Sequence, residues 1–167
     1  MKTIAKEEFC SHIREIETAM YRYALGMLCS PHDAEDAVGE TVLKAWASLE
    51  TLKAAGSFRA WCFAILANQV RSMLRARSRT ELTERPEQYG DRAGMQDGKQ
   101  NDEQEGELWQ LVTELPAKFR NLVILYYYEG FSVKEIARME ELSEGTVKSR
   151  LCRAREKLKR LLEEDAG

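Results

Sequence analysis

The sequence predicts an all-α protein made of two small helical domains joined by a flexible acidic linker. In two long stretches, apolar residues recur every three or four positions, the spacing of one face of a helix. Between these stretches the periodicity fails, and glycine, proline, amides and acids predominate. Such a composition buries too little apolar surface to offset the cost of ordering. We therefore expect helical domains over residues 1–79 and 107–167, with residues 80–106 as the linker.

The bulk composition is that of a soluble globular protein rather than a disordered one. Hydrophobic residues make up 44% and charged residues 32% of the 167 positions, enough for one ordinary domain or two small ones. The longest apolar runs, residues 60–67 and 122–128, are too short to cross a bilayer. No N-terminal signal pattern is visible, so the expected location is the cytoplasm.

The net charge of −3 is unevenly distributed along the chain. Residues 1–79 carry +2 and residues 108–167 carry +1, whereas residues 80–107 carry −6. The acidity therefore belongs to the expected linker, and local basic stripes in either domain remain able to bind nucleic acid.

The reactive residue types form no recognisable catalytic or metal-binding set. The four cysteines are scattered, without the close spacing of a zinc or redox site: Cys10, Cys29, Cys62 and Cys152. His12 and His32 are the only histidines. No nucleophile–base pair and no phosphate-binding glycine loop is recognisable. We expect reduced thiols, no cofactor, no structural metal, no small-molecule substrate and no enzymatic activity.

Three helices are expected in the first domain. The first carries an apolar stripe from Phe9 to Leu28 and is broken at Ser30-Pro31. Pro31 suits the first turn of a second helix, which continues to Leu49. After a loop over residues 50–56, a third helix begins at Ser57. Its expected core residues are Phe58, Trp61, Ile65, Leu66, Met73 and Leu74. We assign Trp61 to the core rather than to stacking on a DNA base.

The second domain is expected to begin with two further helices. Leu108, Leu111, Val112 and Leu115 have helical spacing, Pro116 marks a boundary, and a second helix runs through Phe119 and Tyr126 to a stop at Gly130. The run of residues 123–128 has β propensity, but it is short and lies in helical surroundings, so no strand is expected.

Residues 132–158 have the layout of a helix-turn-helix. Ser132-Val-Lys-Glu135 has the form of a capping box, and a second helix start follows at Ser143. In the second helix, Val147, Leu151 and Ala154 begin one apolar stripe, which Leu158 and Leu161 extend. From Lys148 to Arg160 the other faces carry seven basic residues against one acid. This pattern fits a recognition helix that enters a major groove, although an amphipathic surface helix with extended Lys and Arg side chains has the same pattern.

Two sets of segments resemble the bacterial sigma factors, most closely the small extracytoplasmic-function group. In the second half, Leu115-Pro116, Glu135-Ile-Ala137, Gly145-Thr-Val-Lys-Ser-Arg150 and Arg153-Ala-Arg155 resemble sigma region 4. In the first half, the segments that resemble sigma region 2 are Asp33-Ala-Glu-Asp36, Glu40-Thr41, Lys44-Ala-Trp46, Phe58-Arg-Ala-Trp61, Asn68 and Arg75.

The resemblance implies a sigma factor that binds core RNA polymerase and promoter DNA, and that an anti-sigma factor holds inactive. It implies that polymerase is bound by Asp33, Asp36, Glu40 and Lys44. It implies that the −10 element is read and melted through Arg59, Asn68, Arg71 and Arg75. It implies that the −35 element is read by Glu144, Thr146, Lys148, Ser149, Arg150 and Arg153.

The chain also departs from the pattern of that group. Gly39 stands where the group usually has glutamine, and Val42 where it has an aromatic residue; Ala64 and Ser72 replace a frequent arginine and aspartate. In the turn of the helix-turn-helix, Glu140 and Glu141 replace the usual apolar residue and glycine. A left-handed conformation at Glu141 would cost roughly 1 kcal/mol or more.

Three other functions fit parts of the sequence. A helix-turn-helix transcriptional regulator that is not a polymerase subunit would explain the second half but not the region 2 segments of the first. A sequestering interaction protein would leave the basic recognition helix unexplained. A helical enzyme would need catalytic residues that are not recognisable here.

Overall fold

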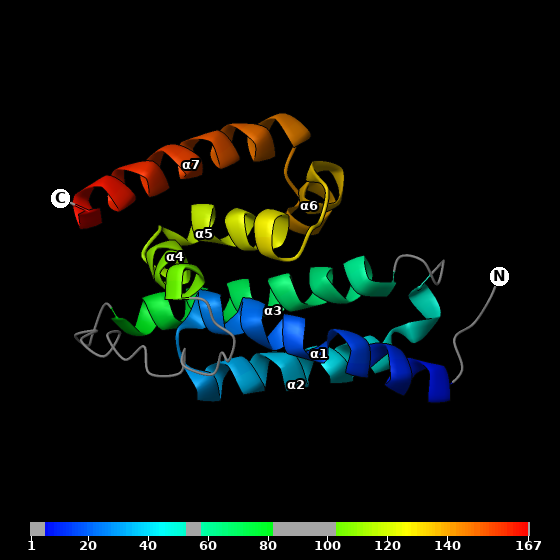
Figure 1. Ribbon diagram of the computed structural model, residues 1–167. Helices are drawn as coiled ribbons and strands as arrows, with labels where there is room; N and C mark the ends of the chain where they lie inside the picture. The colour runs from blue at the N-terminus through cyan, green and yellow to red at the C-terminus, as the bar shows by residue number, and fades with distance from the viewer. Residues whose placement is uncertain (1–5, 53–57, 82–102, 167) are drawn as a thin grey trace. The chain divides into compact units, whose positions relative to one another are not determined.

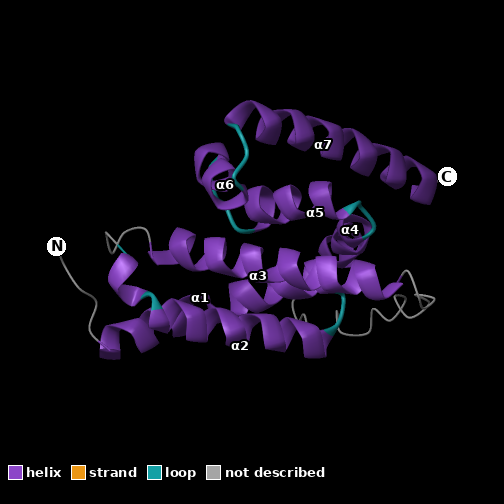
Figure 2. Ribbon diagram, turned by 180° about the vertical axis from the view of Figure 1, so that it is seen from behind, coloured by secondary structure: helices purple, strands orange, loops and turns teal. Residues whose placement is uncertain are grey.

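The computed structural model describes residues 6–52, 58–81 and 103–166 of the chain (Figure 1). Every regular element in these ranges is a helical segment, and no strand occurs within them (Figure 2). The helices gather into two compact units, Met1–Asp91 and Arg92–Gly167. The prediction of an all-α fold with two helical domains is therefore confirmed.

The predicted linker, residues 80–106, lies mostly outside the described residues. Its first two positions, Thr80 and Glu81, still belong to the third helix, and positions 103–106 belong to the fourth. Both helices thus extend into the range that the sequence assigned to the linker.

The first unit is a bundle of three long helices: α1 (Lys6–Leu28), α2 (Pro31–Ala47) and α3 (Phe58–Glu81). A short 3₁₀ turn, η1 (Leu49–Thr51), follows α2. Each of the three helices packs against the other two, and they lie side by side in Figures 1 and 2. Their inner faces supply a core of fully buried side chains: Met20, Tyr23, Leu28, Phe63, Leu66 and Val70.

The corner between α1 and α2 forms where the sequence predicted a break. Cys29 has a left-handed backbone with φ 55°, which turns the chain out of α1. The Asp33 N–H donates to Ser30 Oγ at 3.2 Å, so Ser30 caps the start of α2. Pro31 occupies the first turn, where its missing N–H costs nothing.

The inner face of α3 differs from the predicted one. Phe58 and Leu66 are buried as expected, but the remaining core positions of this helix are Cys62, Phe63, Ala67 and Val70. The other predicted core residues are only partly buried: Trp61, Ile65, Met73 and Leu74. Residues 60–67 are apolar at every position, so the periodicity alone did not select the inner face.

The second unit contains α4 (Glu103–Thr113), α5 (Ala117–Val123), the π-helical turn η5 (Ile124–Tyr128), α6 (Val133–Glu140) and α7 (Glu144–Ala166). Pro116 separates α4 from α5, and Gly130, with φ 77°, ends the segment that η5 completes. Both boundaries were predicted. The unit is centred on side chains that are fully buried: Leu122, Ile124, Leu125, Ile136 and Val147.

The wide turn η5 was not predicted. The Glu129 N–H donates to the Ile124 carbonyl at 2.9 Å, five residues back instead of four. The run of residues 123–128, with its β propensity, is therefore helical, as its surroundings indicated. Its buried residues Ile124 and Leu125 face the core while Tyr127 is half exposed.

Candidate functional site

The frame of the helix-turn-helix begins with the predicted capping box at α6. The Glu135 N–H donates to Ser132 Oγ at 3.0 Å, and the Ser132 N–H donates to Glu135 Oε1 at 2.9 Å. The helix ends at Glu140, and the next residue, Glu141, is left-handed, with φ of 58° and ψ of 43°. The Leu142 N–H then donates to the Ala137 carbonyl at 2.9 Å, which satisfies one of the last carbonyls of α6.

The start of α7 is fixed by a second cap. The Thr146 N–H donates to Ser143 Oγ at 3.0 Å, and Ser143 Oγ donates to Thr146 Oγ1 at 2.9 Å. Three residues, Glu141 to Ser143, thus connect two helices whose ends are both defined by hydrogen bonds. Glu144 in the first turn adds a negative charge at the positive end of the helix dipole.

The buried stripe of α7 orients its polar residues outward. Val147, Leu151 and Ala154 are buried, and the helix packs against α5 and α6. Residues three and four positions apart share a helix face, so the face opposite this stripe is exposed along its length. The structure brings all six predicted −35 residues to the first three turns of α7. Four of them are exposed (Glu144, Lys148, Ser149 and Arg153) and two are half-buried (Thr146 and Arg150).

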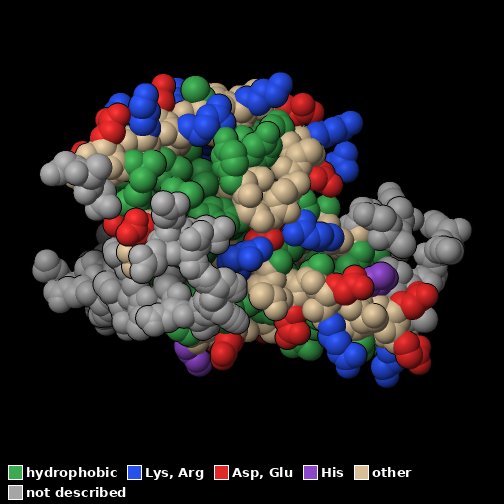
Figure 3. All heavy atoms as spheres, viewed as in Figure 1, with side chains coloured by type: hydrophobic (Ala, Val, Ile, Leu, Met, Phe, Trp, Pro, Cys, Tyr) green, Lys and Arg blue, Asp and Glu red, His purple; other side chains and the backbone are tan. Residues whose placement is uncertain are grey.

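Two basic side chains further along α7 are engaged within the unit. Arg155 Nη1 donates to Tyr127 Oη at 2.9 Å, and this hydrogen bond raises the pKa of Arg155 above its ordinary value. The Lys157 ammonium lies 5.8 Å from the centre of the Phe119 ring. Figure 3 shows Lys and Arg side chains along the outer edge of α7, next to hydrophobic side chains of the same unit.

The outer face of α2 carries three of the four predicted polymerase-binding residues. Asp36, Glu40 and Lys44 are exposed there, and Lys44 Nζ donates to Gln69 Oε1 of α3 at 2.6 Å. Leu43 lies among them with 64% of its surface exposed. The exposure of Leu43 was not predicted from the sequence. It could have been noticed there as a leucine among polar residues, outside the buried stripe of the helix.

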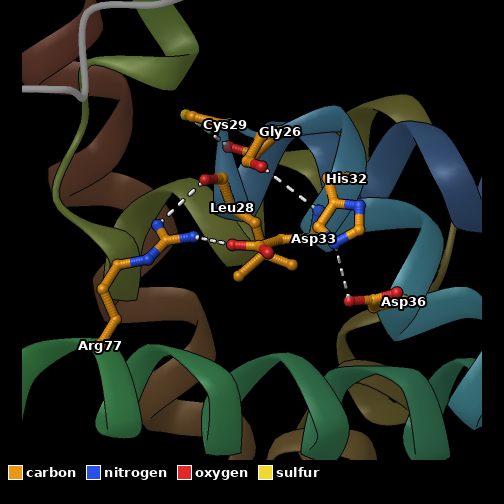
Figure 4. A network of polar contacts seen from close by, with 8 residues as sticks. Gly26, Leu28, Cys29, His32, Asp33, Asp36 and Arg77 are labelled. Carbon is orange, nitrogen blue, oxygen red and sulfur yellow. Dashed lines mark hydrogen bonds and ion pairs between the residues drawn. The ribbon is translucent and has the colours of Figure 1, made fainter.

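The fourth predicted polymerase-binding residue, Asp33, lies in an ion pair within the unit (Figure 4). Arg77 Nη2 donates to Asp33 Oδ2 at 2.8 Å, while Arg77 Nη1 donates to the Leu28 carbonyl at 3.0 Å. One guanidinium therefore joins the end of α3 to the last turn of α1 and the first turn of α2. Both side chains remain partly exposed, at 24% for Arg77 and 36% for Asp33.

The predicted −10 residues are distributed along α3. Asn68 and Arg71 are linked by a hydrogen bond of 3.4 Å between Arg71 Nη2 and Asn68 Oδ1. Arg75, one turn further on, is exposed and shares their face of the helix. Arg59, near the helix start, lies apart from them, with its guanidinium 5.3 Å from the Phe63 ring centre. Trp61 is half-buried and packs near Phe58, with ring centres 5.9 Å apart.

Within the described ranges, no group of three or more His, Cys, Asp or Glu side chains is arranged to hold a metal ion. A helix long and apolar enough to cross a membrane is likewise absent from the part of the chain that the structure describes.

Both units match established families of sequences. Residues 3–80 match the profile of Sigma-70 region 2, and residues 105–158 match that of Sigma-70, region 4. The ECF RNA polymerase sigma factor EcfG of Rhodopseudomonas palustris is 33% identical over 145 residues, which cover 87% of this chain and 80% of EcfG. The chain belongs to the extracytoplasmic-function sigma factors. The resemblance drawn from the sequence is thereby confirmed, and with it the function of an RNA polymerase sigma factor.

Two further relatives extend the comparison. The sigma factor SigE of Mycolicibacterium smegmatis is 32% identical over 152 residues; the match covers 88% of this chain, which spans only 58% of the length of SigE. Among solved structures, the sigma factor RpoE in complex with the anti-sigma factor NepR from Bartonella quintana is similar with a TM-score of 0.76. That match has 28% identity and covers 94% of this chain and 98% of RpoE.

Sigma factors are DNA-binding regulatory subunits that bind core RNA polymerase and promoter DNA. In this sigma factor, the turn of the helix-turn-helix in region 4 forms with Glu141 at the position where the group usually has glycine. Glu141 adopts the left-handed conformation in which glycine carries no steric cost. The departure at this position thus changes the energy of the turn and leaves the two helix ends capped.

Proposed function

We propose that this sigma factor directs core RNA polymerase to promoters through three separate surfaces, one each on α2, α3 and α7. Residues 1–79, which contain α2 and most of α3, form the domain that binds polymerase and melts the −10 element. Residues 107–167, which contain α7, form the domain that reads the −35 element, and residues 80–106 connect the two domains. The single observation that carries the proposal is the exposed face of α7, which is aimed outward by a capped turn and a buried stripe.

Recognition of the −35 element depends on the first turns of α7. Lys148 and Arg150 have donors that suit guanine O6 and N7, and the Glu144 carboxylate can accept from a cytosine amino group. Thr146, Ser149 and Arg153 complete this surface. Lys159 and Arg160, both exposed, are further along and are suited to phosphates.

Recognition of the −10 element depends on one face of α3. Asn68 offers an amide to a base edge, while Arg71 and Arg75 supply positive charge beside it. Arg59 lies at the opposite end of the helix, one residue after its start at Phe58, and adds positive charge there. The half-exposed Trp61 adds an aromatic surface near the same end of the helix.

Docking on polymerase depends on the outer face of α2, where Asp36, Glu40 and Lys44 surround the exposed Leu43. An apolar side chain framed by charges is typical of an interface in which burial supplies affinity and charge fixes the orientation. Asp33 contributes from the same helix while it stays paired with Arg77. An anti-sigma factor, like the NepR partner of RpoE, would compete for these surfaces.

The protein acts in the cytoplasm, where core polymerase and promoters are, and it performs no covalent chemistry of its own. In-vitro transcription on a pool of genomic fragments tests the proposal directly. Core RNA polymerase with the full chain should produce discrete start sites that core polymerase alone does not. A matched variant, Lys148→Ala with Arg153→Ala, should bind core polymerase normally and lose these start sites. Absence of discrete start sites with the wild-type chain would contradict the proposal.

A further inference from the structure

An exposed hydrogen bond joins the wide turn η5 to the long helix α7. Arg155 Nη1 donates to Tyr127 Oη at 2.9 Å across 28 residues of sequence. Tyr127 is 50% exposed, and Arg155 is exposed as well. A hydrogen bond in contact with water contributes little to the stability of a fold, because water replaces either partner. Fold stability alone is therefore a weak reason for this pair.

The chemistry of the two groups fixes which of them donates. A guanidinium has only N–H donors, so Tyr127 Oη is the acceptor. The phenol therefore keeps its own hydrogen for a further partner. The Tyr126 ring packs edge-on against the Tyr127 ring, with centres 4.9 Å apart and planes at 88°, which restricts the movement of the phenol. Two donors, one cationic and one neutral, thus lie side by side at the surface of the second unit.

The pair lies on the face of α7 that carries a predicted base reader. Lys148 and Arg155 are seven residues apart, so they share a helix face and are separated by roughly 10 Å along its axis. The major groove of B-DNA is about 12 Å wide. If the turn at Lys148 meets base edges, a side chain two turns later lies beside the phosphates that border the groove. Lys159, one turn further on, is exposed on the same face and adds positive charge, against the acid Glu156 next to Arg155.

We propose that Tyr127 and Arg155 form a clamp for one backbone phosphate of the −35 element. The guanidinium supplies charge and a charge-assisted hydrogen bond, and the phenol donates a neutral hydrogen bond to an oxygen of the same phosphate. The inference rests on the proposed function of α7 as the −35 reader, and it adds a DNA contact from η5, outside the helix-turn-helix. Such a contact carries no sequence information; it fixes the register of α7 on the duplex.

The two donors respond differently to salt, which provides the test. A cation that neutralises a phosphate releases condensed counterions, whereas a neutral hydroxyl releases none. In holoenzyme bound to a promoter fragment, Tyr127→Phe should raise Kd about fivefold and leave the dependence of Kd on salt unchanged. Arg155→Ala should raise Kd about tenfold and reduce the salt slope by about one. The effects should be less than additive in the double variant, because both groups hold one phosphate.

Ethylation interference locates the contact on the DNA. Promoter fragments that each carry one ethylated phosphate are selected for binding to holoenzyme, and fragments ethylated at a required phosphate are depleted from the bound fraction. Tyr127→Phe and Arg155→Ala should weaken the interference at the same single phosphate of the −35 element and leave the other positions as in the wild type. Weakened interference at two different phosphates would refute the clamp.

Tyr128→Phe is the matched control. It removes a hydroxyl from the next residue of η5, whose ring packs against Trp109 with centres 4.8 Å apart. This variant should keep the Kd and the salt slope of the wild type, and weakening equal to that of Tyr127→Phe would refute the clamp. The melting temperature of Tyr127→Phe, followed by circular dichroism, should stay close to that of the wild type. A marked fall with an unchanged Kd would also refute the clamp, since the bond would then serve the fold.

The variant Lys148→Ala with Arg153→Ala tests the function on which the inference rests. If it loses promoter binding while Tyr127→Phe and Arg155→Ala bind like the wild type at every salt concentration, the clamp is refuted and α7 remains the −35 reader. If the wild-type holoenzyme shows no interference at any −35 phosphate, both are refuted. A changed base preference in Tyr127→Phe would refute the clamp alone, because a phosphate contact is independent of base identity.

Discussion

The Arg77 guanidinium and the Asp33 carboxylate are joined by a hydrogen-bonded ion pair of 2.8 Å across 44 residues of sequence. The same guanidinium donates to the Leu28 carbonyl at the end of α1. Three helices thus meet at one side chain from the C-terminal part of α3 (Figure 4). The face of α3 that bears Asn68 and Arg71 is thereby fixed relative to α2.

Removal of this side chain should destabilise the first unit. We expect Arg77→Ala to lower the free energy of unfolding by about 1–2 kcal/mol, because a charge-assisted hydrogen bond and a helix-terminal bond are lost from a partly exposed site. Urea titration followed by circular dichroism measures the change. Arg79→Ala, which removes an exposed arginine from the last turn of the same helix, should change the free energy by less than about 0.5 kcal/mol.

A double-mutant cycle isolates the ion pair itself. Asp33→Asn keeps the size of the side chain and removes its charge, so the effects of Asp33→Asn and Arg77→Ala should be non-additive. Strict additivity would show that the two side chains stabilise the unit independently, contrary to the geometry.

The turn of the helix-turn-helix can be stabilised at one position. Glu141→Gly should raise the stability of the second unit by about 1 kcal/mol, because φ is 58° there and glycine adopts this conformation without a steric cost. Thermal unfolding measures the shift. Glu141→Ala removes the same charge and keeps the steric cost, so it should not stabilise the unit. Equal stabilisation by both variants would assign the effect to charge.

The four cysteines should differ sharply in reactivity. Burial raises the pKa of the Cys62 thiol to about 12, whereas Cys10 and Cys152 are exposed. Iodoacetamide at pH 8, followed by peptide mass spectrometry, should modify Cys10 and Cys152 quickly and Cys62 only after unfolding in urea. Labelling of native Cys62 at the rate of Cys10 would contradict its burial.

The same thiol makes stability depend on alkaline pH. In the unfolded chain Cys62 loses its proton near pH 9, its ordinary pKa, whereas the folded protein retains it up to about pH 12. The unfolded state therefore binds fewer protons between these values, and stability falls as the pH rises from 9 towards 12. Cys62→Ala should show a shallower decline over this range in urea titrations at matched pH values.

Specificity and general affinity should separate along α7. Lys148→Ala and Arg150→Ala should each cost about 1–3 kcal/mol at one promoter position and relax the base preference there. Lys159→Ala and Arg160→Ala should weaken binding to all promoters alike and reduce the salt slope by about one per lost contact. Holoenzyme binding to a library randomised across the −35 element, at two salt concentrations, distinguishes the two classes. An unchanged base preference in Lys148→Ala and Arg150→Ala would move the readout elsewhere.

Helix boundaries could be predicted from the sequence because they are set by local chemistry. Ser30, Pro116, Gly130, Ser132 and Ser143 each act through their own backbone or a neighbour within four residues. The exposure of the six predicted −35 residues follows from the start of one helix and its buried stripe, while their contact with the −35 element stays a prediction from the resemblance.

Features that depend on contacts between distant segments could not be predicted. The pairing of Asp33 with Arg77 exists only once three helices are packed, so a residue expected to face polymerase is partly engaged inside its own unit. The inner face of α3 was misassigned because its first turns are apolar on every side. The wide turn at residues 124–128, in which Ile124 and Leu125 are buried, has no local signature in the sequence.

The cap at the start of α7 leaves the Thr146 hydroxyl able both to donate and to accept a further hydrogen bond. Ser143 Oγ and Thr146 Oγ1 share one hydrogen bond of 2.9 Å, and a hydroxyl has one hydrogen and two lone pairs. A third partner can therefore either accept from Thr146 or donate to it. In the major groove, guanine N7 and O6 and thymine O4 accept, whereas the amino group of cytosine donates. Opposite a base edge Thr146 would thus tolerate either kind of base, and the choice would fall to its charged neighbours on the helix.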